Sequence, residues 1–304
     1  MEMPSALRRV PPRAALDWVA ASTGPRARVV GVRRLRNAWA SAVHAVDVED
    51  DRAHRHELVL RRWARTDLPP DDGVVENEAA ALQLLAAAPA PVTPQLLACD
   101  PEARRADVPA LVMTRLPGHV ELAPADLDAY LDGLAASLRA IHALPRPGAS
   151  LDTYRPWGLD DAAVPPWTNA RGLWTDAIEL ARAAVPAFAP VFCHRDFHPG
   201  NVLWRHATVT GVVDWTHACT GPAAADVAHC RANLALLFGL GAADDFARRY
   251  GPVDDLAWFD LVDIVGMSAL DAWRWQDAGR LDVTPESLAQ GADAFLADAV
   301  RRLG

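Results

Sequence analysis

The stretch that decides the fold is residues 193–204, which read CHRDFHPGNVLW. It contains His-Arg-Asp, four further residues and then an asparagine, so that Asn201 follows Asp196 by five positions and leads into a short apolar run. A second acid, Asp214, ends a second apolar run in TGVVDW at 210–215. Amide and carboxylate oxygens are the hard ligands that Mg²⁺ prefers. If both runs are strands, the pattern predicts that Asn201 and Asp214 lie close together and hold magnesium, with Asp196 left as a base.

This sparse set is sufficient for phosphoryl transfer, which depends on positioning and charge neutralisation more than on covalent chemistry. One alternative is a polar loop between two core strands, in which Asp196 and Asn201 are turn residues. Another is a zinc or iron hydrolase, because four histidines surround the two acids in the sequence. The two-histidine helical motif of metalloproteases is missing. These four histidines are His194, His198, His206 and His217.

The same arrangement is found in the protein-kinase catalytic loop, where the aspartate takes the hydroxyl proton and the asparagine holds a magnesium ion. The stretch resembles the aminoglycoside phosphotransferase and choline-kinase-like family, whose loop reads His-Gly-Asp-x-His-x-x-Asn. Arg195 stands where that family has glycine. GVVDW at 211–215 resembles the family's metal-binding strand, and GPAAADVA at 221–228 resembles its Gly-Asp-Pro-x-x-Asp-Leu-Ala segment. The resemblance is sharp only from 193 to 229.

This resemblance implies an α+β, two-lobed protein-kinase-like fold. The N-lobe, a small antiparallel sheet that covers the nucleotide, is expected over residues 1–115, and the larger, mainly helical C-lobe over residues 116–304. The implied activity is ATP-dependent transfer of phosphate to a small-molecule hydroxyl, with GTP also open as the donor. An aminoglycoside or another sugar-containing antibiotic is a candidate acceptor, which makes antibiotic resistance a candidate role.

The chain has no lysine, and all 30 of its basic residues are arginine. The family uses a strand lysine, fixed by a helix glutamate, to hold the α- and β-phosphates. By resemblance Arg61 takes the place of that lysine and Glu78 is its partner. Guanidinium suits the role because its donors match phosphate oxygens. Arg62 competes for it, and strand alternation places Arg61 and Arg62 on opposite faces.

The hinge between the lobes is expected at 109–118, where an apolar strand ends in Pro-Gly. By resemblance Met113 is the gatekeeper, and the backbone of Thr114 and Leu116 binds adenine. An ordinary edge strand is the alternative.

The family's glycine-rich turn falls on residues 35–41, LRNAWAS, which contain no glycine. Backbone approaches phosphate most easily at glycine. Asn37 and Ser41 remain as side-chain donors, and a plain hairpin turn is the alternative.

Hydrophobic periodicity predicts the other elements. Strands are expected at 29–32, 42–48 and 57–63, and helices at 14–22, 76–85 and 127–144. Asp226 is expected to brace the catalytic loop by resemblance. Thr216 stands where many relatives carry another acid.

Beyond residue 150, two features are candidates for acceptor binding. The tryptophans of 154–175 suit either sugar stacking or packing under a loop. Asp263, Asp271 and Asp277 suit either protonated amines or a solvated helix face.

The net charge of −9 argues against nucleic-acid binding. A signal peptide is not expected, because Arg13 and Asp17 interrupt the N-terminal apolar stretch, and no apolar run approaches the length of a membrane span. The four cysteines form no Cys-x-x-Cys pair, which predicts reduced thiols in a cytoplasmic protein. Neither Phe-Gly after Asp214 nor an Ala-Pro-Glu segment is present, so a protein substrate is not expected.

Two other functions are consistent with these departures. A non-catalytic kinase-like binding protein would explain the missing turn glycines and lysine. A metal-dependent hydrolase would explain the histidines.

Overall fold

The computed structural model describes nine segments, and it divides the chain into two compact units. Unit 1 comprises Met1–Pro117 with Val213–Thr216, and unit 2 comprises Gly118–Val212 with His217–Gly304. Asn37, Asp271 and Asp277 lie outside the described residues. The described segments are 9–35, 41–63, 73–88, 92–146, 151–183, 185–267, 275–276, 279–280 and 282–304.

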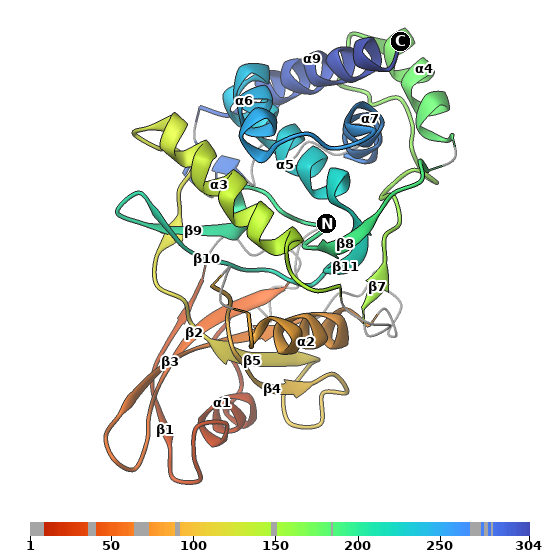
Figure 1. The fold of residues 1–304 in the computed structure, drawn as a ribbon. Helices are drawn as coiled ribbons and strands as arrows, with labels where there is room; N and C mark the ends of the chain where they lie inside the picture. Colours follow the sequence, from red (N-terminus) through yellow and green to blue (C-terminus); the bar gives the residue numbers. More distant parts are fainter. Residues whose placement is uncertain are drawn as a thin grey trace. The chain divides into compact units, whose positions relative to one another are not determined.

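Unit 1 is built on a five-stranded antiparallel sheet in the order β1-β2-β3-β5-β4 (Figure 1). The three strands expected before residue 64 are present, and the hinge strand pairs with the third of them. The fifth strand, β4, was not predicted, because LLACD does not alternate in polarity. The strands are β1 (Arg28–Arg34), β2 (Ala42–Glu49), β3 (Arg55–Arg62), β4 (Leu96–Asp100) and β5 (Ala110–Thr114).

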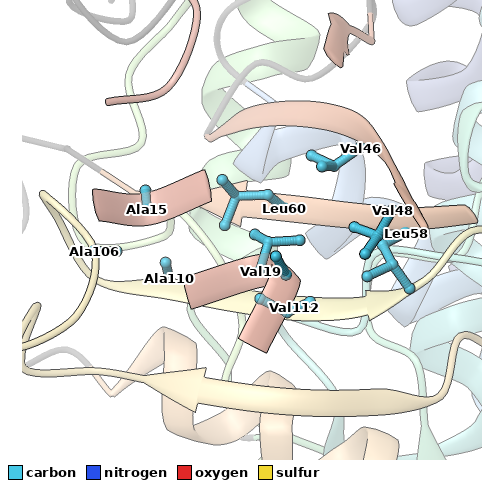
Figure 2. Packing of buried hydrophobic residues seen from close by; sticks show 10 residues of the cluster. Ala15, Val19, Val46, Val48, Leu58, Leu60, Ala106, Ala110 and Val112 are labelled. Atoms are coloured by element: carbon cyan, nitrogen blue, oxygen red, sulfur yellow. The ribbon is translucent and has the colours of Figure 1, made fainter. Parts of the chain in front are cut away.

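The two faces of this sheet carry different helices. Helix α1 (Arg13–Ala21) places Ala15 and Val19 against Leu60 and other apolar side chains of β2, β3 and β5, as Figure 2 shows. Helix α2 (Val74–Leu85) contacts β4 and β5. Because side chains alternate along β3, Leu60 faces α1 while Arg61 faces the opposite side, toward α2.

Unit 2 is organised around helix α5 (Ala223–Phe238), which is buried along nearly its whole length. A helix without a polar face must be enclosed on all sides. Helices α6 (Leu240–Tyr250), α7 (Leu256–Gly266) and α9 (Pro285–Leu303) pack around it (Figure 1). The unit also contains α3 (Leu127–His142), α4 (Arg171–Ala181) and a short 3₁₀ helix, Pro199–Asn201.

Two three-stranded sheets in unit 2 frame the catalytic stretch. In one, β8 precedes the loop and pairs antiparallel with β11. In the other, β9 follows the loop and pairs antiparallel with β10. The six strands are β6 (His119–Val120), β7 (Asp152–Thr153), β8 (Pro190–Cys193), β9 (Val202–Arg205), β10 (Thr208–Val212) and β11 (Cys219–Pro222).

Within the described residues, no helix combines the length and the apolar character needed to cross a membrane.

The core of unit 1 gives a stability prediction. Leu60 is fully buried beneath α1, so Leu60→Ala should lower the free energy of unfolding by about 2–5 kcal/mol. The matched control is Leu97→Ala in β4, whose side chain is 39% exposed, and this change should cost less than about 1 kcal/mol. Urea unfolding followed by tryptophan fluorescence measures both. Equal losses would contradict this description of the core.

Candidate active site

The catalytic loop is held by its backbone. Asp226, in the first turn of α5, accepts hydrogen bonds from the backbone N–H groups of His194 (2.8 Å) and Arg195 (2.6 Å). His142 of α3 contacts the same carboxylate at 2.9 Å. Burial raises the pKa of Asp226, but the hydrogen bond and charge of His142 outweigh it and keep this pKa below its ordinary value. The expectation that Asp226 braces the loop is therefore confirmed.

Arg195 adopts a positive φ of 71°, a conformation that favours glycine. This explains physically why glycine suits the second position of such a loop. The Arg195 side chain is buried, and its guanidinium lies 3.7 Å from the ring centre of Trp157 and 4.9 Å from that of Tyr154. These contacts offset a strain of about 1–2 kcal/mol.

Asp196 and Asn201, which follow Arg195 in the loop, are in direct contact. The side-chain amide of Asn201 donates to the backbone carbonyl of Asp196 (2.9 Å) and to its Oδ2 (3.1 Å). A carbonyl oxygen only accepts, so the NH₂ group of Asn201 must face Asp196 and its own carbonyl oxygen must face away. The Asp196 side chain keeps 26% of its surface exposed, which leaves the carboxylate within reach of a substrate.

His229 of α5 also contacts the candidate base, and sequence reasoning missed it. Its Nε2 lies 3.1 Å from Oδ1 of Asp196, and its Nδ1 lies 3.1 Å from Oδ1 of Asp263 in α7. The available signal was its spacing from Asp226. Residues three apart share a helix face, so once Asp226 is known to brace the loop, His229 must face the loop too.

The charges of this cluster reinforce one another. Burial lowers the pKa of His229, but the Asp263 carboxylate and the hydrogen bond to Asp196 outweigh burial and raise it to about 10. Burial likewise raises the pKa of Asp196, and the hydrogen bond from His229 with the charge of His198 brings it well below the ordinary range. The favoured state is therefore an imidazolium between two carboxylates.

In unit 1, Arg61 brings two carboxylates together. Its NH1 lies 2.8 Å from Oε1 of Glu78 and its NH2 lies 2.7 Å from Oδ1 of Asp214, while Nε donates to Oγ of Ser41 at 2.8 Å. Burial lowers the pKa of Arg61, but the carboxylates of Asp214 and Glu78 raise it by more than burial lowers it. The net shift of this pKa is therefore upward. Arg62, the competing residue, instead pairs with Asp107 at 2.7 Å.

Helix α2 also holds the segment that carries Asp214. The amide of Asn77 donates to the carbonyl of Thr216 (2.9 Å), and Oε1 of Glu78 accepts from the N–H of Trp215 (3.2 Å). The hydroxyl of Thr216 donates to Oδ1 of Asp214 at 2.8 Å. Thr216, which stands where many relatives carry another acid, thus orients the carboxylate of Asp214.

Glu78 is almost fully buried, and its Oε2 has no hydrogen-bond partner among the described residues. Burial raises the pKa of Glu78 to about 7, although the charge of Arg61 opposes this.

The hinge residues lie where β5 ends. Met113 is buried in the sheet. The N–H of Thr114 already donates a hydrogen bond to the carbonyl of Gln95 (2.9 Å). The backbone group of Thr114 that is a candidate to bind a ligand is therefore its carbonyl oxygen. Leu116 follows this strand and is partly buried.

The described residues that were candidates for binding the acceptor substrate are mostly engaged with other side chains of the protein. Asp263, with only 7% of its side chain exposed, contacts His229 and lies 3.8 Å from NH1 of Arg195. It is therefore neither part of a solvated face nor an open site for an amine. Trp174 is fully buried, and its Nε1 donates to Asp293. Trp157, by contrast, lies beside the loop through Arg195.

Each unit thus gathers part of the expected set, Asp196 and Asn201 in unit 2 and Arg61, Glu78 and Asp214 in unit 1. Of the four histidines of the hydrolase alternative, only His198 belongs to a cluster with metal-ligand spacing, the one formed with Asp196 and His229 among the described residues.

Residues 31–262 match the sequence pattern of a family described as the phosphotransferase enzyme family. One curated relative is a homoserine kinase of Gluconobacter oxydans (strain 621H), 32% identical over 140 residues. That match covers 41% of this chain and 43% of the relative.

Solved structures show the same fold at low identity. A thermostable mutant of aminoglycoside phosphotransferase APH(4)-Ia has a TM-score of 0.61 and 19% identity, covering 91% of this chain and 96% of that one. Aminoglycoside 2′-phosphotransferase-IIIa, in its GDP complex, has a TM-score of 0.59 and 17% identity, covering 90% and 94%. The protein-kinase-like fold is therefore confirmed.

The His229 cluster predicts a pH-dependent stability. Folding raises the pKa of His229 from 6.5 to about 10. A base with a raised pKa stabilises the folded state while it is protonated, so the contribution is complete below pH 6.5 and is lost as the pH rises through about 10. Over this interval the free energy of unfolding should fall more steeply for the wild type than for His229→Gln. Denaturant titrations at a series of pH values measure both slopes, and parallel slopes would contradict an imidazolium here.

Proposed function

The chain belongs to the phosphotransferase enzyme family, and we propose that it transfers the γ-phosphoryl group of ATP to a hydroxyl group of a small molecule. Asp196 is the proposed base, Asn201 and Asp214 the magnesium ligands, and Arg61 the phosphate-binding cation. The observation that carries the proposal is the pairing of Asp196 with Asn201 on a loop that Asp226 holds by its backbone.

The donor set suits magnesium. With its NH₂ group engaged on Asp196, the amide of Asn201 has its carbonyl oxygen as the ligand atom. Asp214 supplies a carboxylate, whose orientation Thr216 supports. One or two carboxylates and several waters are what Mg²⁺ takes from a protein. The ion would neutralise charge on the phosphate oxygens.

In the proposed reaction, Asp196 orients the acceptor hydroxyl and takes up its proton. A bond forms between the acceptor oxygen and the γ-phosphorus, and the bond from that phosphorus to the β–γ bridging oxygen breaks. The products are the phosphorylated acceptor and ADP. Asp196 then releases its proton to water, which its exposed edge permits.

Arg61 supports the phosphate-binding role because its guanidinium is rigidly held. Glu78 and Ser41 fix it from within unit 1, and a fixed guanidinium matches the oxygens of the α- and β-phosphates. Arg61 also pairs with Asp214, so metal-nucleotide binding would exchange part of that ion pair for contacts to phosphate and metal.

For the nucleotide, we propose that the carbonyl of Thr114 and the backbone of Leu116 contact adenine, with Met113 as gatekeeper. Neighbours of the same fold are described as complexes with ADP, with AMP-PNP and with GDP. Backbone groups of this kind accommodate either purine, so ATP is the proposed donor and GTP a second one.

The acceptor is proposed as a hydroxyl compound of small size. Solved neighbours are described with hygromycin B and with kanamycin, and the curated relative is a homoserine kinase. Asp263 already contacts Arg195 and His229. Its carboxylate is therefore not available to bind an amine of an aminoglycoside.

The metal-dependent hydrolase is less well supported. Its metal would need the cluster of Asp196, His198 and His229. A histidine ligand must be neutral at the coordinating nitrogen, whereas each ring nitrogen of His229 lies 3.1 Å from a carboxylate, one of Asp196 and one of Asp263.

Asp196→Ala tests the base directly. It should lower kcat by a factor of about 100 or more, while the affinity for magnesium-nucleotide changes little. Phosphate transfer from radiolabelled ATP and nucleotide titration calorimetry measure the two effects, with exposed Asp282→Ala as the control. Wild-type turnover in Asp196→Ala would remove Asp196 from the mechanism.

Arg61→Ala should raise the KM for ATP about tenfold or more, since a charge-assisted contact contributes about 1.5–3 kcal/mol. This variant removes the cation that pairs with Glu78 and Asp214 and so loses stability. Arg61→Lys, which retains the charge, is therefore measured beside it and should give an intermediate KM. The control is Arg28→Ala, at an exposed pair with Glu49. An unchanged KM in both Arg61 variants would transfer the role to Arg62.

A panel of hygromycin B, kanamycin, L-homoserine and choline, assayed with magnesium-ATP, identifies the acceptor class. Phosphorylation of any of them distinguishes an enzyme from a non-catalytic nucleotide-binding protein. Nucleotide binding with no transfer to any acceptor or to water would favour the latter.

A further inference from the structure

We propose that His229, itself held by Asp263, is a positioning residue that fixes the carboxylate of Asp196 for reaction. This inference rests on the proposed function, in which Asp196 is the base. His229 belongs to no motif of the sequence, and it reaches the loop from a helix that begins after the catalytic strands.

The contacts form a closed ring. Asp196 contacts His229 at 3.1 Å, His229 contacts Asp263 at 3.1 Å, and Asp263 lies 3.8 Å from the guanidinium of Arg195. Arg195 is the residue that precedes Asp196 in the chain. The ring therefore ties the Asp196 side chain back to its own backbone through α5 and α7.

The ring nitrogens of His229 define its role. Each faces a carboxylate oxygen, and carboxylates accept hydrogen bonds but do not donate them. The amide nitrogen of Asn233 also lies near Nε2, but at 3.4 Å it is farther away than the Asp196 carboxylate at 3.1 Å. The two nearest partners thus favour a ring with protons on both nitrogens. An imidazolium in this state cannot take a proton from a substrate, so His229 acts on Asp196 by holding it and by stabilising its negative charge.

The two oxygens of Asp196 are held from different directions. His229 contacts Oδ1, while Asn201 donates to Oδ2. Rotation of the carboxylate would break both contacts at once. Because small displacements of a reacting group reduce rates strongly, fixing this rotation before the substrate binds favours the reaction.

The plane of the imidazole is fixed as well. The Trp157 ring meets it edge to face, with centroids 5.7 Å apart and an interplanar angle of 90°. The same indole lies against the guanidinium of Arg195. Arg195 thus contacts both Asp263 and Trp157. Glycine, which the backbone conformation at this position favours, could make neither side-chain contact.

The experiment is a double-mutant cycle of His229→Gln and Asp263→Asn. With the acceptor identified by the panel, and with water as a second acceptor, His229→Gln should lower kcat about 10- to 100-fold while the KM for ATP stays within about threefold. Asp263→Asn should lower kcat about three- to tenfold. Because Asp263 acts through His229, the double variant should match His229→Gln within about twofold.

Two controls accompany the cycle. His54→Gln alters an exposed histidine that pairs with Asp50 and should leave kcat unchanged. Thermal unfolding of each variant separates loss of folded protein from loss of turnover. A kcat for His229→Gln within about twofold of wild type overturns the proposal. So does an Asp263→Asn effect that persists undiminished when His229 is already Gln.

A spectroscopic measurement keeps this inference separate from the proposed function. In ¹⁵N-labelled wild-type protein at neutral pH, the ring of His229 should show protons on both nitrogens, assigned by comparison with His229→Gln. A singly protonated ring overturns the proposal whatever the activity. A doubly protonated ring in a protein that transfers no phosphate would instead reject the proposed function, on which the role of His229 depends.

Discussion

The carboxylate of Asp226 is the constraint on which the catalytic loop depends. It is completely buried, and it accepts two consecutive backbone hydrogen bonds from the loop. Left without a partner, a buried backbone N–H costs about 1–3 kcal/mol. By satisfying two of them, Asp226 allows the chain to turn sharply after β8 and to present Asp196 and Asn201 in a single orientation.

Helix α5 explains how this constraint extends to the chemistry. Asp226 in its first turn holds the loop backbone, and His229 three residues later holds the side chain of Asp196, the proposed base. The helix itself is fixed because it is buried on all sides by α6, α7 and α9. One buried helix thus carries both residues that hold the loop, Asp226 and His229.

Much of this arrangement could be predicted from the sequence. Asp196, Asn201 and Asp214 could be singled out as candidates because their spacing is local, and the strands of unit 1 could be predicted because their residues alternate. Strand β4 was missed because its residues, LLACD, show no alternation in polarity. His229 was missed, and Asp263 was assigned to acceptor binding or to a solvated face, because their contacts join segments more than 30 residues apart. Sequence spacing reports neighbours along one element, whereas packing decides which elements meet.

In the proposed nucleotide site, Arg61 offers a guanidinium where an amine would be expected, and this affects how nucleotide binding can be studied. A guanidinium held by Glu78 and Asp214 keeps its positive charge throughout the working pH range. Acyl-phosphate nucleotide probes label kinases by acylating a lysine amine, and this chain contains no lysine. A survey of nucleotide-binding proteins by such reagents would therefore pass over this protein, even if it bound ATP tightly.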